Sequence, residues 1–429
     1  MASLEEQVVH SAALPPTIDL ASLQRRTLRL LFATQIISGI GVAIGSSVGA
    51  LLAAQLADVR ISGFALSAIV VGSAVLALPA TAIVQRLGRR LSLATTYSFA
   101  ALGAIVVVLA ALRESVAFLF VGFFFFGGGT AAGLQARYAA VDLAAPVHRG
   151  RHLSIIVWAT TLGAVAGPNF AALAGASLNG YGIPTLAGPF VFSAVLFAVA
   201  AVLLLTLMRP DPAIVARQVS ASSAGDATAQ RGTVGMRVAL GVVLREPSAR
   251  LGVIAMAVGH VVMIAVMAMT PVHIRNAGHG AEHTLRIVGV VLSVHIAGMY
   301  AFAPVVGWLT DRIGRRAVIL MGIGFLLAAC AVAGTAGHQS PQLALGLMLL
   351  GIGWSSTMVA GSTMLSESVS VELRAAAQGL SDFTMGLASA TAGALSGVIM
   401  QAWGFPLLAL GAALATIPLV ALSARHLRA

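Results

Sequence analysis

"DRIGRR", residues 311–316, is the second copy of a pattern that first occurs as "QRLGRR" at residues 85–90. The two copies are offset by 226 residues, from position 85 to position 311. A second set of charged residues recurs at an offset of 225, from position 142 to position 367: Asp142 and Arg149, then Glu367 and Arg374. Two independent anchors at nearly the same spacing predict a chain that is built from a duplicated unit.

Each unit consists of apolar runs that are long enough to cross a membrane. Hydrophobic residues make up 59% of the 429 residues and charged residues only 9%, which excludes a soluble globular protein. About 20 apolar residues cross a hydrocarbon core of roughly 30 Å. Twelve such runs occur between about Leu30 and Leu422. We therefore predict an all-α membrane protein with twelve transmembrane helices, arranged as two six-helix halves.

The domain boundaries follow from changes in composition. The stretch "RPDPAIVARQVSASSAGDATAQRGTV" begins with prolines and continues with Ser, Ala and Gly, which is typical of a linker. The predicted parts are a cytoplasmic tail (1–28), a first half (29–208), a cytoplasmic linker (209–250), a second half (251–424) and a cytoplasmic tail (425–429).

The positive charge of the chain comes from arginine alone, since the sequence contains no lysine. If the N-terminus is inside, four of the 25 basic residues fall outside: Arg60, Arg113, Arg275 and Arg286. This bias follows the positive-inside rule and predicts a bacterial inner-membrane protein with both termini in the cytoplasm. Membrane topology explains the charge, so we expect the lipid bilayer, and not nucleic acid, as the partner.

A P-loop needs a lysine at the phosphates, so we expect no nucleotide partner of that kind. The sequence predicts a secondary transporter, not an enzyme, that works as a monomer on a small solute or a metal ion and carries no cofactor. A proton-coupled exporter of small organic compounds or drugs is one alternative, and a membrane sensor that has lost transport is another.

The stretch "GWLTDRIGRR", Gly307–Arg316, resembles the signature G-x-L-x-D-R-x-G-R-R of the major facilitator superfamily. The resemblance implies alternating access between two halves, with this loop acting in the gate. The gating residues would be Asp311, Arg312, Arg315 and Arg316, with Arg86, Arg89 and Arg90 in the first half. The first-half copy departs from the signature at Thr81 and Gln85, which predicts a weaker or differently paired latch. These arginines could alternatively serve topology alone.

Two further features of the first half allow a structural and a functional interpretation. "GAVAGP", with Gly163, Gly167 and Pro168, resembles the antiporter element G-x-x-x-G-P of the same superfamily, although small residues also let helices pack closely. The run Phe123 to Phe126 is expected to face lipid.

Methionine and histidine form stripes on two predicted spans. Met256, His260, Met263 and Met267 lie within about 60° of arc on the seventh span. His295 and Met299, four residues apart, share a face of the eighth span. A rise of 1.5 Å per residue places Met263 about 15 Å below the outer boundary, near the midplane.

Thioether and imidazole donors suit monovalent copper, whereas hard cations prefer carboxylate oxygens. The two motifs are similar to those of the CcoA-like bacterial copper importers of the superfamily. That resemblance implies metal-binding roles for Met263, Met267, His295 and Met299, and helical phase adds His260 and Met256. The sequence therefore predicts copper as the transported substrate. Core packing by methionine and proton transfer by the histidines are the alternatives.

Asp382 lies about seven residues into the eleventh span. A carboxylate in a membrane is costly unless it is functional or paired. We predict that it couples transport to protons. An ion pair with Arg374 or Arg149 is the alternative.

Overall fold

A computed structural model describes residues 19–144, 149–223, 236–278, 280–369 and 371–425, and these residues form helices joined by short turns. The helices of the first half are α1 (Leu20–Leu56), α2 (Val59–Leu87), α3 (Arg89–Leu112), α4 (Val116–Phe126), α5 (Gly128–Ala139), α6 (Arg149–Ser177), the 3-10 turn η2 (Asn179–Tyr181) and α7 (Gly188–Leu207). Only Gly127 separates α4 from α5, so the two form one pass.

The linker contains two short helices, α8 (Pro212–Ser223) and α9 (Met236–Arg245). The second half follows with α10 (Pro247–Arg275), α11 (Ala281–Tyr300), α12 (Ala303–Ile313), α13 (Arg315–Gly334), α14 (Ser340–Glu367), α15 (Val371–Leu414) and α16 (Ile417–Arg425). Gly404, with φ 79°, divides α15 into a long first helix and a short second helix that is followed by α16.

The prediction of a twelve-span, all-helical membrane protein is confirmed. Ten segments of the described residues are long and apolar enough to span a membrane. One of them, Ala377–Ser423, contains the break at Gly404 and so comprises two passes. The long helix α6 adds a further pass.

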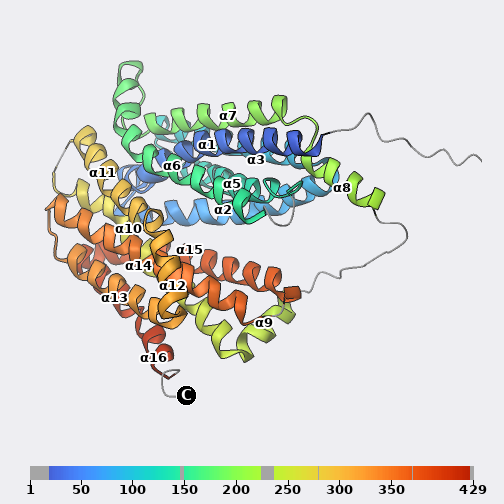
Figure 1. Ribbon diagram of the computed structural model, residues 1–429. Helices are drawn as coiled ribbons and strands as arrows, with labels where there is room; N and C mark the ends of the chain where they lie inside the picture. Colours follow the sequence, from blue (N-terminus) through green and yellow to red (C-terminus); the bar gives the residue numbers. More distant parts are fainter. Residues whose placement is uncertain (1–18, 145–148, 224–235, 279, 370, 426–429) are drawn as a thin grey trace, which may run out of the picture.

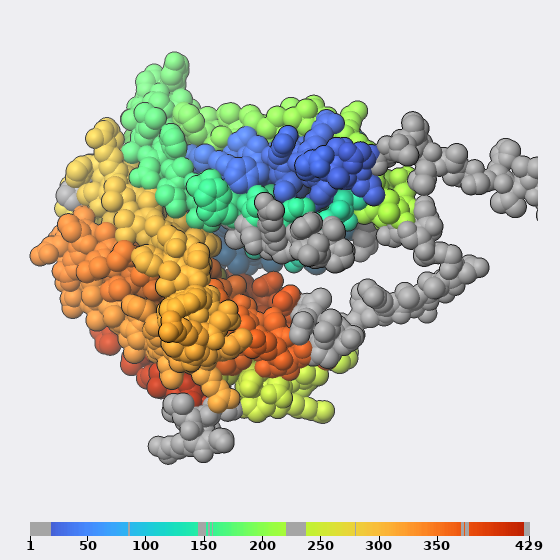
Figure 2. All heavy atoms as spheres, in the orientation of Figure 1, coloured from blue at the N-terminus to red at the C-terminus, as the bar shows by residue number. Residues whose placement is uncertain are grey.

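The halves contact each other at one end and separate at the other. We call the end at which α1 begins, and where α8 and α9 lie, the linker end, and the opposite end the far end (Figure 1). Helix α2 packs against α15, and α6 packs against α11. Figure 2 shows a cleft between the halves that opens toward the linker end.

The expectation that the phenylalanine run faces lipid is wrong for two of its members. Phe123 and Phe126 are fully buried. Phe126 packs edge-on against Phe190 and Phe197 of α7, with ring centroids 5.6 and 5.3 Å apart. A helix turns by 100° per residue, so four consecutive side chains cannot share one face, and positions 123 and 126 point into the half.

Candidate functional site

A cavity of about 250 Å³ lies between the two halves. The first half contributes residues of α1, α2, α5 and α6, and the second half contributes residues of α10 and α11. Its lining includes Ser46, Ser47, Ala50, Thr130, Met267 and Leu292. A site shared by both halves changes shape when the halves move, which a carrier requires.

The cavity is mainly apolar, and none of the described side chains that line it is charged. The Ser47 hydroxyl donates to the Ile44 carbonyl at 2.8 Å, within its own helix. Apolar surface with a few hydroxyl groups favours a small organic molecule that is held by shape.

The predicted metal ligands on α10 lie in different surroundings. Met267 lines the cavity, whereas Met263 and Met256 are buried, each with 3% of its surface exposed. The Met256 sulfur lies 3.7 Å from the Ser381 hydroxyl of α15. Groups of three or more His, Cys, Asp or Glu residues suitable for a metal ion do not occur in the described part of the chain.

The predicted ligands on α11 face α14. His295 is fully buried, and its Nδ1 lies 2.8 Å from the Leu347 carbonyl of α14. Because a carbonyl only accepts, Nδ1 carries the hydrogen and Nε2 of the neutral ring keeps a lone pair. This Nε2 is buried and has no hydrogen-bond partner among the described residues. Met299 is also buried.

In His260 the hydrogen is on the other ring nitrogen. The Trp354 indole N–H of α14 donates to His260 Nδ1 at 2.8 Å, so the Nδ1 lone pair is occupied and Nε2 of the neutral ring carries the hydrogen. Trp354 also packs edge-on against Tyr300, with centroids 6.0 Å apart. The sequence interpretation missed Trp354 and Tyr300. A tryptophan within a glycine- and serine-rich span was the available signal.

Arg137 of α5 lies nearer to the linker end than the cavity does. It is seven residues, or about 10 Å of helix rise, beyond Thr130. Its guanidinium acts electrostatically on Tyr300 of α11 and on Asp382 of α15. Its Nε is buried and lacks a hydrogen-bond partner among the described residues. Arg137 of the other half is therefore one electrostatic partner of Asp382, while the side chains of Arg149 and Arg374 lie outside the described residues.

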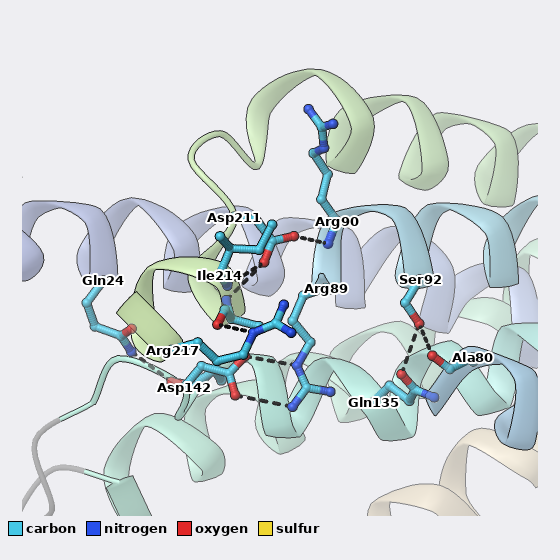
Figure 3. Close-up of polar contacts among 12 residues, drawn as sticks. Gln24, Ala80, Arg89, Arg90, Ser92, Gln135, Asp142, Asp211, Ile214 and Arg217 are labelled. Atoms are coloured by element: carbon cyan, nitrogen blue, oxygen red, sulfur yellow. Dashed lines mark hydrogen bonds and ion pairs between the residues drawn. The ribbon is translucent and has the colours of Figure 1, made fainter. Parts of the chain in front are cut away.

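The two repeated loops adopt the same turn. Gly88 and Gly314 have φ values of 92° and 91°, in the region that favours glycine. Arg89 Nε bonds Asp142 at 2.9 Å (Figure 3), and Arg315 Nη2 bonds Glu367 at 2.6 Å. The symmetry-related residues make symmetry-related ion pairs, each within its own half.

The other predicted gating residues have diverse contacts. Asp311 lies 3.7 Å from Arg315, and the Arg312 guanidinium stacks 5.0 Å from the centre of the Trp308 ring. Arg86 is exposed. Arg90 binds Asp211 through its backbone N–H. The ion pairs of Arg89 with Asp142 and of Arg315 with Asp311 and Glu367 each lie within one half.

The two ion pairs differ in burial, and this difference predicts unequal effects on stability. Arg89 and Asp142 are 15% and 16% exposed, whereas Glu367 is 52% exposed. Asp142→Ala leaves a largely buried guanidinium unpaired and should lower the free energy of unfolding by about 3 kcal/mol. Glu367→Ala should cost less than about 1 kcal/mol. Denaturant titration in detergent measures both, and equal losses would contradict this assignment.

The far end is closed by close backbone contacts and hydrogen bonds. The Gln401 side-chain amide of α15 donates to Asp58 at 3.1 Å, and its oxygen accepts from the Arg60 N–H at 3.0 Å. Hydrogen bonds from the Arg60 N–H and from Gln401 hold the pKa of Asp58 below its ordinary value, so this carboxylate is ionised at neutral pH. Ser67 of α2 donates to the Ala390 carbonyl at 2.6 Å. We call this contact of α2 with α15 the far-end seam.

The residues of the antiporter-like element pack against α1. A Cβ at Gly163 would lie 2.7 Å from the Ile36 carbonyl oxygen, and a Cβ at Gly167 would lie 2.5 Å from the Ala43 side chain. Pro168 lines the cavity. Close packing accounts for both glycines, and the antiporter role stays a prediction.

Comparison with known proteins agrees with this architecture. The family description "Major Facilitator Superfamily" matches residues 31–285 and 279–428. An uncharacterized transporter of this type from Bacillus subtilis, YddS, is 37% identical over 93% of this chain and 90% of its own. The riboflavin transporter RfnT of Brucella anthropi is 26% identical over 90% of this chain and 92% of its own. The structure of the nucleoside transporter NupG superposes with a TM-score of 0.70 at 16% identity, covering 93% of this chain and 98% of that one.

Proposed function

Because the chain belongs to the major facilitator superfamily, we propose that it is a secondary transporter that carries a small organic solute by alternating access. The observation that carries the proposal is the uncharged cavity of about 250 Å³ between the halves. Pockets for drug-sized ligands measure roughly 300 to 1,000 Å³, so this cavity suits a smaller molecule. A bare metal ion would fill little of it.

We assign the linker end to the cytoplasm. Four arginines, Arg60, Arg113, Arg275 and Arg286, belong to the far end by their places in the helices, and the other arginines of the described helices lie toward the linker end. The positive-inside rule supports this orientation. With the far-end seam closed, the conformation then faces inward.

Copper import remains a second candidate because of one observation, the buried and unpartnered Nε2 of His295. A ring held by Nδ1–H against a carbonyl is the usual arrangement of a metal-binding histidine. Of the predicted sulfur ligands, Met267 lines the cavity and Met299 is buried on α11, the helix of His295. Because Nδ1 of His260 already accepts a hydrogen bond from Trp354, we do not include His260 among the metal ligands.

One experiment tests both candidates. Small organic solutes are screened for thermal stabilisation of the purified protein, and hits are assayed for transport in proteoliposomes. Ala50→Leu fills the cavity and should reduce transport at least tenfold, whereas Ala82→Leu, at an exposed position of α2, should not. Unchanged transport by Ala50→Leu would refute the organic-solute site. Copper uptake by the same vesicles that is lost in His295→Ala would instead support the second candidate.

A further inference from the structure

The linker begins with a carboxylate that two helices share. Asp211 Oδ1 accepts hydrogen bonds from the N–H groups of Ala213 at 2.9 Å and Ile214 at 3.3 Å, and so caps α8. Asp211 Oδ2 accepts a third hydrogen bond, at 2.7 Å, from the Arg90 N–H in the first turn of α3 (Figure 3). One side chain therefore joins the linker to the repeated loop of the first half.

The two repeated loops differ at this point. A Cβ at Gly88 would overlap Oδ2 of Asp211 and lie 2.5 Å from its Cγ. A Cβ at Gly314, the equivalent glycine, would have no neighbour within 4 Å. The same turn occurs in both halves, but a carboxylate contacts the glycine of the turn only in the first half, at Gly88.

The sequences of the loops explain the difference. The second loop has its own acid, Asp311, which lies 3.7 Å from Arg315. The first loop has Gln85 at that position and two arginines, Arg89 and Arg90, at the start of α3. A helix N-terminus and adjacent arginines both favour a negative charge nearby, and with glutamine at position 85 the first loop does not supply it.

We propose that Asp211 supplies from the linker the carboxylate that the first loop lacks, and thereby fastens α8 to the first half. Asp211 is a positioning residue: it holds the turn that presents Arg89 to Asp142. Helix α8 then moves with the first half during transport, and the tether between the halves begins only after α8. This role is independent of which solute is carried.

Asparagine at position 211 separates capping from bridging. Asparagine caps helices about as well as aspartate, so the amide oxygen of Asp211→Asn keeps the bonds to Ala213 and Ile214. Its amide nitrogen cannot accept from the Arg90 N–H. Asp19→Asn is a matched control because Asp19 caps only its own helix, through Ala21 and Ser22.

Spin labels on α8 and α3 measure the bridge in the full chain. Labels at Val219→Cys (36% exposed) and Leu102→Cys (48% exposed), in a Cys330→Ser background, should give a narrow distance distribution. Asp211→Asn and Asp211→Ala should at least double its width, and Asp19→Asn should leave it unchanged. A wild-type width for Asp211→Asn would overturn the bridge.

A second measurement tests the missing carboxylate. Asp211→Asn should lower the melting temperature. Adding Gln85→Asp should restore it, because the first loop then has an acid of its own, while the distance distribution stays broad. If Gln85→Asp restores none of the melting temperature, the claim that Asp211 substitutes for the missing acid is wrong.

Discussion

Replacing Gly63 with valine is expected to prevent closure of the far-end seam and to abolish transport. A Cβ at Gly63 of α2 would overlap the Gly393 carbonyl oxygen of α15 and lie 2.8 Å from the Gly397 N–H nitrogen. These neighbours are backbone atoms, which cannot rotate away as a flexible side chain would. Overpacking typically costs 1–3 kcal/mol, so the equilibrium constant for closing the far end should fall about 5- to 150-fold.

Spin labels across the far end give the measurement. Tyr181→Cys in the first half and Gln339→Cys in the second are both exposed at this end, and Gly63→Val should shift their distances to longer values. Gly386→Val is the matched control, because a Cβ at Gly386 of α15 has no neighbour within 4 Å. A distance distribution like that of the wild type would show that the seam accommodates the added side chain.

Reversing the charge of Arg137 is expected to reduce transport more than tenfold, and exchanging it with Asp382 to restore much of the loss. Arg137 and Asp382 interact electrostatically across the two halves. Arg137→Glu replaces this attraction with repulsion between two acids, and because Asp382 is exposed to solvent the change should amount to about 2 kcal/mol. Arg137→Asp with Asp382→Arg returns opposite charges.

The effect of exchanging Arg137 and Asp382 is measured as the rate of transport of the solute that the stabilisation screen identifies. Arg113→Glu, a charge reversal at the exposed end of α3, is the control and should have little effect. If the exchanged protein stays as inactive as Arg137→Glu, Asp382 does not act through Arg137. A proton-coupling role, for which Asp382 is our candidate, would then have to be sought without this partner.

The fold was largely predictable because it depends on patterns that are local or periodic. The offset between the two loops placed Arg89 and Arg315 at equivalent positions, and the structure gives them equivalent turns and ion pairs. The partner of Arg89 was not predictable in the same way. Asp142 is 53 residues away, and the chain crosses the first half twice, through α3 and then through α4 and α5, before it reaches Asp142.

The site was less predictable because helical phase fixes a direction but not the neighbour in that direction. His260 and Met267 lie on the same face of α10. The Trp354 indole donates a hydrogen bond to His260, whereas Met267 lines the cavity. His295 shares its stripe with Met299 but bonds the backbone of α14. Composition assigned Asp211 to a linker, but composition does not indicate which loop the Asp211 side chain contacts.

The make-up of the far-end seam determines how much energy is needed to separate α2 from α15. Apart from Asp58, the seam depends on neutral hydrogen bonds and glycine backbone contacts. A neutral hydrogen bond contributes a net of about 1 kcal/mol, so separating the seam should cost only a few kcal/mol. A solute with millimolar affinity provides about 4 kcal/mol of binding free energy. A solute that binds the state with the open far end more tightly by this amount is enough to separate the seam, so tight binding is not required for this step.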